Sequence, residues 1–158
     1  MNIILIGTNG AGKTTIATKL YKDGYHVFKE APRGKHHFAA ATLCLTDHHI
    51  VFDRWNVIDR AIYEQEENHL HLVLNCAEEV NRNNVIIYMR NDVVPYDAGY
   101  DDSRSVQRPP SKERIELDKQ YYFYTQMLIA AGIDVKTVYV HPDVEATYTQ
   151  IKQLIGGE

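Results

Sequence analysis

The fold is decided by one stretch, Gly7-Thr8-Asn9-Gly10-Ala11-Gly12-Lys13-Thr14, which fits the pattern G-x-x-x-x-G-K-[ST]. It follows the apolar run Ile3–Ile6 and precedes a segment whose apolar residues have helical spacing. Glycines let a backbone curl closely around phosphate oxygens, and the helix that follows adds the positive end of its dipole. The sequence therefore predicts a phosphate-binding loop between a buried strand and a helix.

Each residue type in this loop has a role in holding a nucleotide. A lysine such as Lys13 supplies a mobile positive charge for the β and γ phosphates, and the hydroxyl of Thr14 can coordinate Mg²⁺. We therefore expect ATP as the phosphate donor and Mg²⁺ as the cofactor. The residues expected to bind ATP are Gly7, Asn9, Gly10, Ala11, Gly12, Lys13, Thr14 and Thr15.

Short apolar runs recur along the chain and alternate with helix-like stretches, a pattern typical of parallel strands covered by helices on both faces. We predict an α/β three-layer sandwich with a five-stranded parallel sheet, of the type found in P-loop nucleotide kinases. One domain over residues 1–158 fits this length and the 44% content of hydrophobic residues. The predicted strands are Ile3–Ile6, His26–Phe28, Ile50–Phe52, Val85–Tyr88 and Val135–Val140.

Two helices can be bounded from the sequence. The first begins in Gly12–Thr15 and ends at Asp23-Gly24, where glycine can terminate it. The second covers Ser111–Ala131, with Ser111 as N-cap and Gly132 as its end. The residues expected to face inward are Ile16, Ala17 and Leu20 in the first helix and Leu117, Tyr121, Tyr124, Leu128 and Ala131 in the second, with the tyrosines in the core.

A polar segment with several prolines and aspartates separates these parts of the chain at residues 91–110. Loops of this length within compact domains are usually functional lids or disordered segments. We predict a lid-like loop here.

A carboxylate and a guanidinium follow the third predicted strand. In a parallel sheet, Asp53 comes to lie at the carboxyl edge beside the phosphate-binding loop, where it is the natural second contact of Mg²⁺. Arg54 can hold two phosphate oxygens with its planar fork, and the alternative is a surface ion pair. Trp55, Asp59 and Tyr63 follow at spacings of four and share one helix face, which could meet a ribose or base or serve packing alone.

With these motifs, the chain resembles thymidylate kinases and the related deoxynucleoside kinases. Gly10–Thr15 is similar to their phosphate-binding loop, and Asp53-Arg54-Trp55 to their Asp-Arg-aromatic triplet. The resemblance implies that Arg54 holds the phosphate of the acceptor. It also implies that lid arginines, here Arg104 and Arg108, close over the phosphates.

Two features depart from the pattern of that family. The family's Arg-Glu-Pro sequence at the end of the second strand corresponds here to Lys29–Arg33, so that Glu30 is kept and Arg33 is displaced. Only residues 31–52 separate Glu30 from Asp53, whereas the family usually has a long helical segment there that shapes the base pocket. A more open site, or one completed by a second subunit in a homodimer, would follow.

Charge and composition limit the partners. The net charge of −4 gives no field that attracts nucleic acid or an anionic membrane, so DNA is not favoured by the net charge. Cys44 and Cys76 have no metal-ligand spacing and fit reduced core thiols, which is typical of a cytoplasmic protein. The histidines fit surface or strand-end positions, and no membrane-spanning segment is expected.

Three functions stay open from the sequence. The leading hypothesis is an ATP-dependent kinase of (deoxy)nucleoside monophosphates, in which Arg54 and Arg33 clamp the acceptor phosphate. The alternative is a kinase that phosphorylates a hydroxyl of a deoxynucleoside or of a nucleotide within DNA, with Glu30 or Asp53 taking the proton. The third is an ATP-binding module without kinase activity. The residues expected to act in catalysis are Lys13, Glu30, Asp53, Arg54, Arg104 and Arg108, and those expected to bind the acceptor are Glu30, Arg33, Arg54, Trp55, Asp59 and Tyr63.

Overall fold

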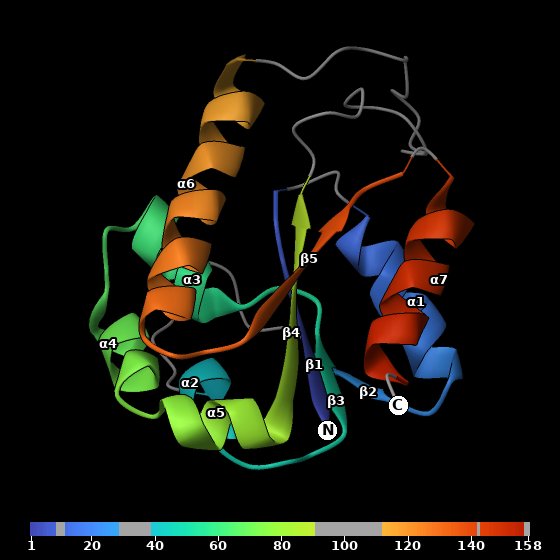
Figure 1. Cartoon of the computed structure of the whole chain (residues 1–158), viewed down its shortest axis with the longest axis horizontal. Helices are drawn as coiled ribbons and strands as arrows, with labels where there is room; N and C mark the ends of the chain where they lie inside the picture. The colour runs from blue at the N-terminus through green and yellow to red at the C-terminus, as the bar shows by residue number, and fades with distance from the viewer. Residues whose placement is uncertain (9–11, 29–38, 91–111, 142, 157–158) are drawn as a thin grey trace.

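The structure is a computed structural model of the whole chain. It describes residues 1–8, 12–28, 39–90, 112–141 and 143–156, with the backbone alone for 112–114 (Figure 1). The lid-like loop predicted at 91–110 and the N-cap predicted at Ser111 lie outside the described residues.

The described part of the chain contains a five-stranded sheet in the order β2-β3-β1-β4-β5, and all neighbouring strands are parallel. The central strand β1 is completely buried because it has neighbours on both sides and helices on both faces. The five predicted strands and the parallel sheet are confirmed. The strands are β1 (Asn2–Ile6), β2 (His26–Phe28), β3 (Ile50–Phe52), β4 (Asn84–Arg90) and β5 (Val135–Tyr139).

Helices cover both faces of the sheet, as Figure 1 shows. One core is formed under α1 (Lys13–Lys22) and α7 (Val144–Ile155). The other core lies on the opposite face, and the three-layer architecture is confirmed. That face carries α2 (Ala39–Leu43), α3 (Asn56–Tyr63), α4 (Asn68–Leu74), α5 (Ala77–Asn83) and α6 (Lys112–Ala130).

The two helices bounded from the sequence are α1 and α6. Helix α1 ends before Gly24, whose φ of 107° closes the turn, and its three expected core residues are buried. Helix α6 ends at Ala130 rather than Ala131, because the chain turns at Gly132 with a φ of 92°. Ala131 is therefore exposed, and its prediction as an inward-facing residue is wrong.

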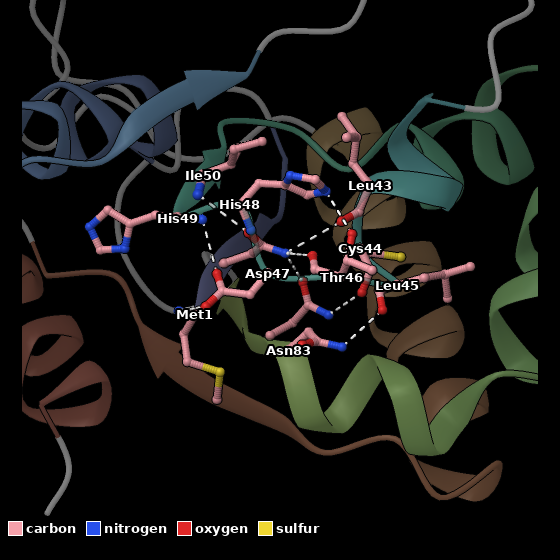
Figure 2. Close-up of polar contacts among 12 residues, drawn as sticks. Met1, Leu43, Cys44, Leu45, Thr46, Asp47, His48, His49, Ile50 and Asn83 are labelled. Carbon is pink, nitrogen blue, oxygen red and sulfur yellow. Dashed lines mark hydrogen bonds and ion pairs between the residues drawn. The ribbon is translucent and has the colours of Figure 1, made fainter.

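A polar network organises the amino edge of the sheet, opposite to the phosphate-binding loop (Figure 2). The buried side chain of Asn2 donates to Thr46 O at 2.8 Å and accepts from the backbone N–H of His48 at 2.9 Å. The amino group of Met1 contacts Asp47 at 2.7 Å, which holds the pKa of that carboxyl below its usual value. These contacts fix the turn that leads into β3, and β3 is the strand that Asp53 follows.

The cysteines and histidines take different environments. Cys44 and Cys76 both carry free thiols and belong to the core, and burial raises the pKa of Cys44 to about 12. His48 is exposed before β3, whereas His69 is buried in α4 and departs from the expected surface position. In the described parts of the chain, no helix combines the length and the apolar character that crossing a membrane requires.

Candidate active site

The phosphate-binding loop begins where β1 passes very close to β4. A Cβ added to Gly7 would lie 2.6 Å from the carbonyl oxygen of Met89, closer than any real Cβ contact. The backbone of Gly7 also has a φ of 153°, a conformation that side chains rarely adopt. Only glycine therefore lets the chain leave the sheet at this point and turn into the loop.

Lys13 is held at the base of this loop. Its Nζ donates to the carbonyl oxygens of Gly7 and Thr8, both at 2.7 Å, and the residue is buried. Gly12 precedes it with a left-handed backbone, and α1 begins at Lys13 itself. The ammonium group of Lys13 thus lies at the positive end of the helix dipole, an arrangement suited to phosphate.

Asp53 lies beside the first turn of α1. The hydroxyl of Thr14 donates to Asp53 Oδ2 at 3.0 Å, and Asp53 is buried at the carboxyl end of β3. Hydroxyl and carboxylate oxygens fit Mg²⁺, which usually takes one or two protein ligands together with phosphates and water. The described residues offer no group of three or more His, Cys, Asp or Glu side chains that could hold a metal. The Thr14–Asp53 pair is therefore the candidate magnesium site.

The triplet that begins with Asp53 points its side chains in different directions. Arg54 is exposed, whereas Trp55 is 1% exposed and packs into the core below α3. The surroundings of Trp55 thus indicate a packing role for this residue. Arg54 is the member of the triplet that is open to solvent beside the candidate magnesium site.

Helix α3 brings a carboxylate toward the same region. Tyr121 of α6 donates from its hydroxyl to Asp59 Oδ1 at 2.5 Å, and Tyr121 is buried. Burial raises the pKa of Asp59, while the hydrogen bond from Tyr121 and the charges of Lys13 and Arg54 act in the opposite direction. Burial, together with the neighbours Asp59 and Tyr63, also raises the pKa of Tyr121.

Asp59 and Tyr63 are expected on one helix face, and in the structure both lie next to Tyr121. Tyr121 was expected in the core, and it is in the core, but its hydroxyl reaches the site. Its position within an apolar stripe gave no sign of this contact, because the partner lies 62 residues away.

A second polar group that the sequence did not indicate lies at the end of β4. Asp118 of α6 is buried and accepts a hydrogen bond from the Tyr88 hydroxyl at 2.9 Å. Its other oxygen is 3.9 Å from Arg90 Nε, and the Arg90 guanidinium lies 4.6 Å from the centre of the Tyr122 ring. Since Tyr88 pairs with Ile6 in the sheet, Arg90 lies at the carboxyl edge where β1 enters the loop.

Several predicted site residues lie outside the described part of the chain. They are Asn9, Gly10 and Ala11 of the loop, Glu30 and Arg33 after β2, and Arg104 and Arg108 of the lid-like loop.

Neither the known protein-family models nor the curated protein sequences match this chain. Solved structures do match it. The YorR protein from Bacillus subtilis, in complex with phosphorylated GDP, aligns with a TM-score of 0.68 and 17% identity over 99% of this chain and 96% of its own. Deoxyadenosine kinase from M. mycoides with bound dCTP aligns with a TM-score of 0.63 and 20% identity over the whole of both chains.

The same deoxyadenosine kinase with bound dATP aligns with a TM-score of 0.56 and 20% identity, over 99% of this chain and 100% of that one. At these identities the alignments establish the fold. The P-loop kinase type of α/β sandwich, predicted from the sequence, is confirmed.

Proposed function

We propose that this protein is an ATP-dependent kinase that transfers the γ-phosphate to a (deoxy)nucleoside monophosphate. The observation that carries the proposal is the position of Lys13 Nζ, 2.7 Å from two loop carbonyls. Thr14 follows it in the first turn of α1 and is hydrogen-bonded to Asp53 at the end of β3. This is the arrangement that a triphosphate with a divalent cation requires. The fold shared with a deoxyadenosine kinase supports phosphoryl transfer as such, without favouring a monophosphate over a nucleoside acceptor.

Phosphoryl transfer asks the protein mainly to align the reactants and to neutralise negative charge. When bound, Mg²⁺ neutralises charge on the phosphates, and Thr14 and Asp53 would hold it. Lys13 would bind the phosphates after exchanging its carbonyl partners for phosphate oxygens. Arg104 and Arg108 would add positive charge from the lid-like loop.

Arg54 is the proposed clamp for the acceptor phosphate. It is exposed and directly follows Asp53, so its guanidinium can reach a phosphate that approaches the candidate magnesium site. A monophosphate has a second pKa of about 6 and is largely a dianion at neutral pH, so it needs a cation more than a base. Arg33 would support the same phosphate.

The proposed base and sugar site is the group Asp59, Tyr63 and Tyr121. Asp59 is partly buried, its Oδ1 accepts from Tyr121, and its Oδ2 has capacity for donors of the acceptor. Both carboxylate and tyrosine would be oriented before binding, because the 2.5 Å contact ties α3 to α6. Trp55, which is buried in the core, would support the proposed base and sugar site.

The second candidate is a kinase that phosphorylates a hydroxyl of a deoxynucleoside. The favouring observation is the alignment of the whole chain with a deoxyadenosine kinase. In this case Glu30 or Asp53 would accept the proton of the hydroxyl. A nucleotide within DNA stays an acceptor to be tested, although the net charge of −4 gives it no support.

The test is transfer of labelled γ-phosphate from ATP with Mg²⁺ to separate nucleosides, nucleoside monophosphates and DNA. Transfer to a monophosphate supports the first proposal, and transfer to nucleosides or DNA alone favours the second. Glu30→Gln should then reduce the rate of transfer strongly if the acceptor is a hydroxyl, and only mildly if the acceptor is a phosphate. An ATP-binding module without kinase activity would bind ATP and transfer nothing to any of them.

A further inference from the structure

Strand β4 ends in an arginine that lies beside the start of the phosphate-binding loop. Arg90 directly follows Met89, whose carbonyl oxygen would lie 2.6 Å from a Cβ added to Gly7. The carbonyl oxygen of Gly7 in turn accepts from Lys13 Nζ at 2.7 Å. Arg90 therefore begins one residue away from the contact that holds the loop against the sheet.

Both strands beside β1 lead into an arginine. The sheet order is β2-β3-β1-β4-β5, so β3 and β4 are the neighbours of β1. Arg54 comes two residues after the end of β3, and Arg90 is the last residue of β4. Because these strands are parallel, their carboxyl ends meet at one edge of the sheet. The loop that follows β1 thus has one arginine on each side.

Arg90 lies on the face of the sheet that also carries the proposed base and sugar site. Side chains alternate between the two faces along a strand, so Arg90 shares the face of Tyr88, which packs in the core under α6. Helix α6 also supplies Tyr121, whose hydroxyl meets Asp59. Helix α1 covers the other face (Figure 1). Arg90 is therefore on the acceptor side of the loop.

Two contacts with α6 place the guanidinium of Arg90. Its Nε lies 3.9 Å from Asp118 Oδ2, an ion-pair contact that is longer than a hydrogen bond. Its Cζ lies 4.6 Å from the centre of the Tyr122 ring, and such a cation–π contact involves the charge rather than the N–H groups. These two contacts orient the cation without using its N–H donors.

The alternative role for Arg90 is a purely structural ion pair with Asp118. Asp118 is buried, and a buried carboxylate needs hydrogen bonds to compensate for lost hydration. The Tyr88 hydroxyl supplies one of them, at 2.9 Å from Oδ1. The Arg90 side chain is 26% exposed, and ion pairs that solvent reaches usually contribute little to stability. This position suits the binding of an anion better than the support of the core.

We propose that Arg90 binds the phosphate of the acceptor from the side opposite Arg54, and so makes the site prefer a nucleoside monophosphate over a nucleoside. The inference rests on the proposed function. A guanidinium fork can hold two phosphate oxygens, and a monophosphate that is largely a dianion at neutral pH can engage two arginines. A nucleoside offers no such group. Arg90 is thus a specificity-determining residue for the class of acceptor.

The test is a thermodynamic cycle that separates a phosphate contact from a structural role. Titration calorimetry measures the binding of the common deoxynucleosides and of their monophosphates, with saturating ADP and Mg²⁺ to fill the donor site. The quantity compared is the dissociation constant of each nucleoside divided by that of its monophosphate. We expect Arg90→Met to lower this ratio by about 10- to 100-fold, because a charge-assisted contact is lost, and to leave nucleoside binding within about twofold.

Matched variants accompany Arg90→Met. Arg54→Met should lower the same ratio from the other side of the loop. Arg82→Met should leave it unchanged, because this arginine of α5 is 64% exposed and pairs with Glu78 of the same helix. Tyr122→Leu, which removes only the ring beside the guanidinium, should lower the ratio by about two- to fivefold, since cation–π contacts at exposed sites are weak.

Circular dichroism verifies that each variant is folded. If Arg90→Met does not fold, Arg90→Lys provides the test, because it keeps the positive charge beside Asp118. An ammonium group lacks the planar fork that holds two phosphate oxygens, so Arg90→Lys should still lower the ratio. A wild-type ratio in a folded Arg90→Lys chain would overturn the inference in that case.

The remaining outcomes distinguish this inference from the proposed function. Equal losses of nucleoside and monophosphate binding in Arg90→Met would overturn the inference, since the residue would then act through the structure of the site. If Arg54→Met lowers the ratio and Arg90→Met does not, the proposed function stands and the inference alone fails. If the wild type binds nucleosides as tightly as monophosphates, the proposed acceptor class fails and the inference fails with it.

Discussion

The hydrogen bond between Tyr121 and Asp59 makes a prediction that combines stability with pH. Tyr121→Phe removes the hydroxyl that donates to Asp59 Oδ1 at 2.5 Å and leaves the ring in place within the core. A buried acceptor that loses its donor costs about 1–3 kcal/mol. For a chain of this size, the melting temperature should fall by roughly 3–10 °C at neutral pH.

The loss should depend on pH in a defined direction. The pKa of Asp59 is raised in the folded protein, and the hydrogen bond from Tyr121 opposes that rise. Removing it raises this pKa further, so the folded state of the variant binds its proton more readily. A raised folded pKa contributes stability that is present at low pH and lost as the pH rises through the folded pKa. The variant should therefore lose more stability at pH 7 than near pH 4.5, a pH that lies close to the ordinary pKa of a carboxyl group.

The assay is thermal unfolding at several pH values, followed by circular dichroism. The matched control is Tyr122→Phe, which removes the same hydroxyl from the next residue of α6, where the ring is exposed. An equal loss at all pH values, or a loss no larger than that of the control, would refute the role of Tyr121 as the partner of Asp59.

Three further predictions concern the loop and the thiols. Gly7→Ala places a Cβ at 2.6 Å from Met89 O, where ordinary contact begins at 3.4 Å, so β1 and β4 must separate by about 0.8 Å. Since the carbonyl oxygen of Gly7 anchors Lys13, the rate of ATP turnover should fall on the order of 100-fold. A wild-type rate of turnover in this variant would contradict the prediction. Thr14→Ala should raise the Mg²⁺ concentration required for ATP turnover, whereas Thr14→Ser, which keeps the hydroxyl, should restore it; an unchanged requirement in both would remove Thr14 from the metal site. Because burial raises the pKa of Cys44 to about 12, iodoacetamide at neutral pH should label Cys76 before Cys44, and mass spectrometry of the labelled peptides measures the order.

Local sequence patterns were enough for the frame of the fold. Five apolar runs predicted the five strands, and the glycine at position 24 marked the end of α1, because these signals depend on neighbouring residues alone. The same kind of signal wrongly placed Ala131 on the inward face of α6. The apolar periodicity of the sequence continues to Ala131, but the helix ends at Ala130 because the chain turns at Gly132.

Contacts between distant residues could not be predicted in the same way. Tyr121 fits an apolar stripe, and nothing in its neighbourhood indicates that its hydroxyl meets a carboxylate 62 residues earlier. The pair Arg90 and Asp118 depends equally on how α6 packs against the end of β4. The Thr14–Asp53 contact is different, because the loop motif and a strand-ending carboxylate both lead to the carboxyl edge of a parallel sheet.

The proposed kinase activity depends on Lys13, which we expect to bind the phosphates of the nucleotide during transfer to an acceptor. The most direct measurement is transfer of labelled γ-phosphate from ATP to nucleosides and nucleoside monophosphates by Lys13→Ala, compared with wild type and with Lys22→Ala, an exposed lysine of the same helix. We expect Lys13→Ala to abolish transfer while remaining folded, and Lys22→Ala to be as active as wild type. Full activity of Lys13→Ala would show that this lysine does not bind the transferred phosphate.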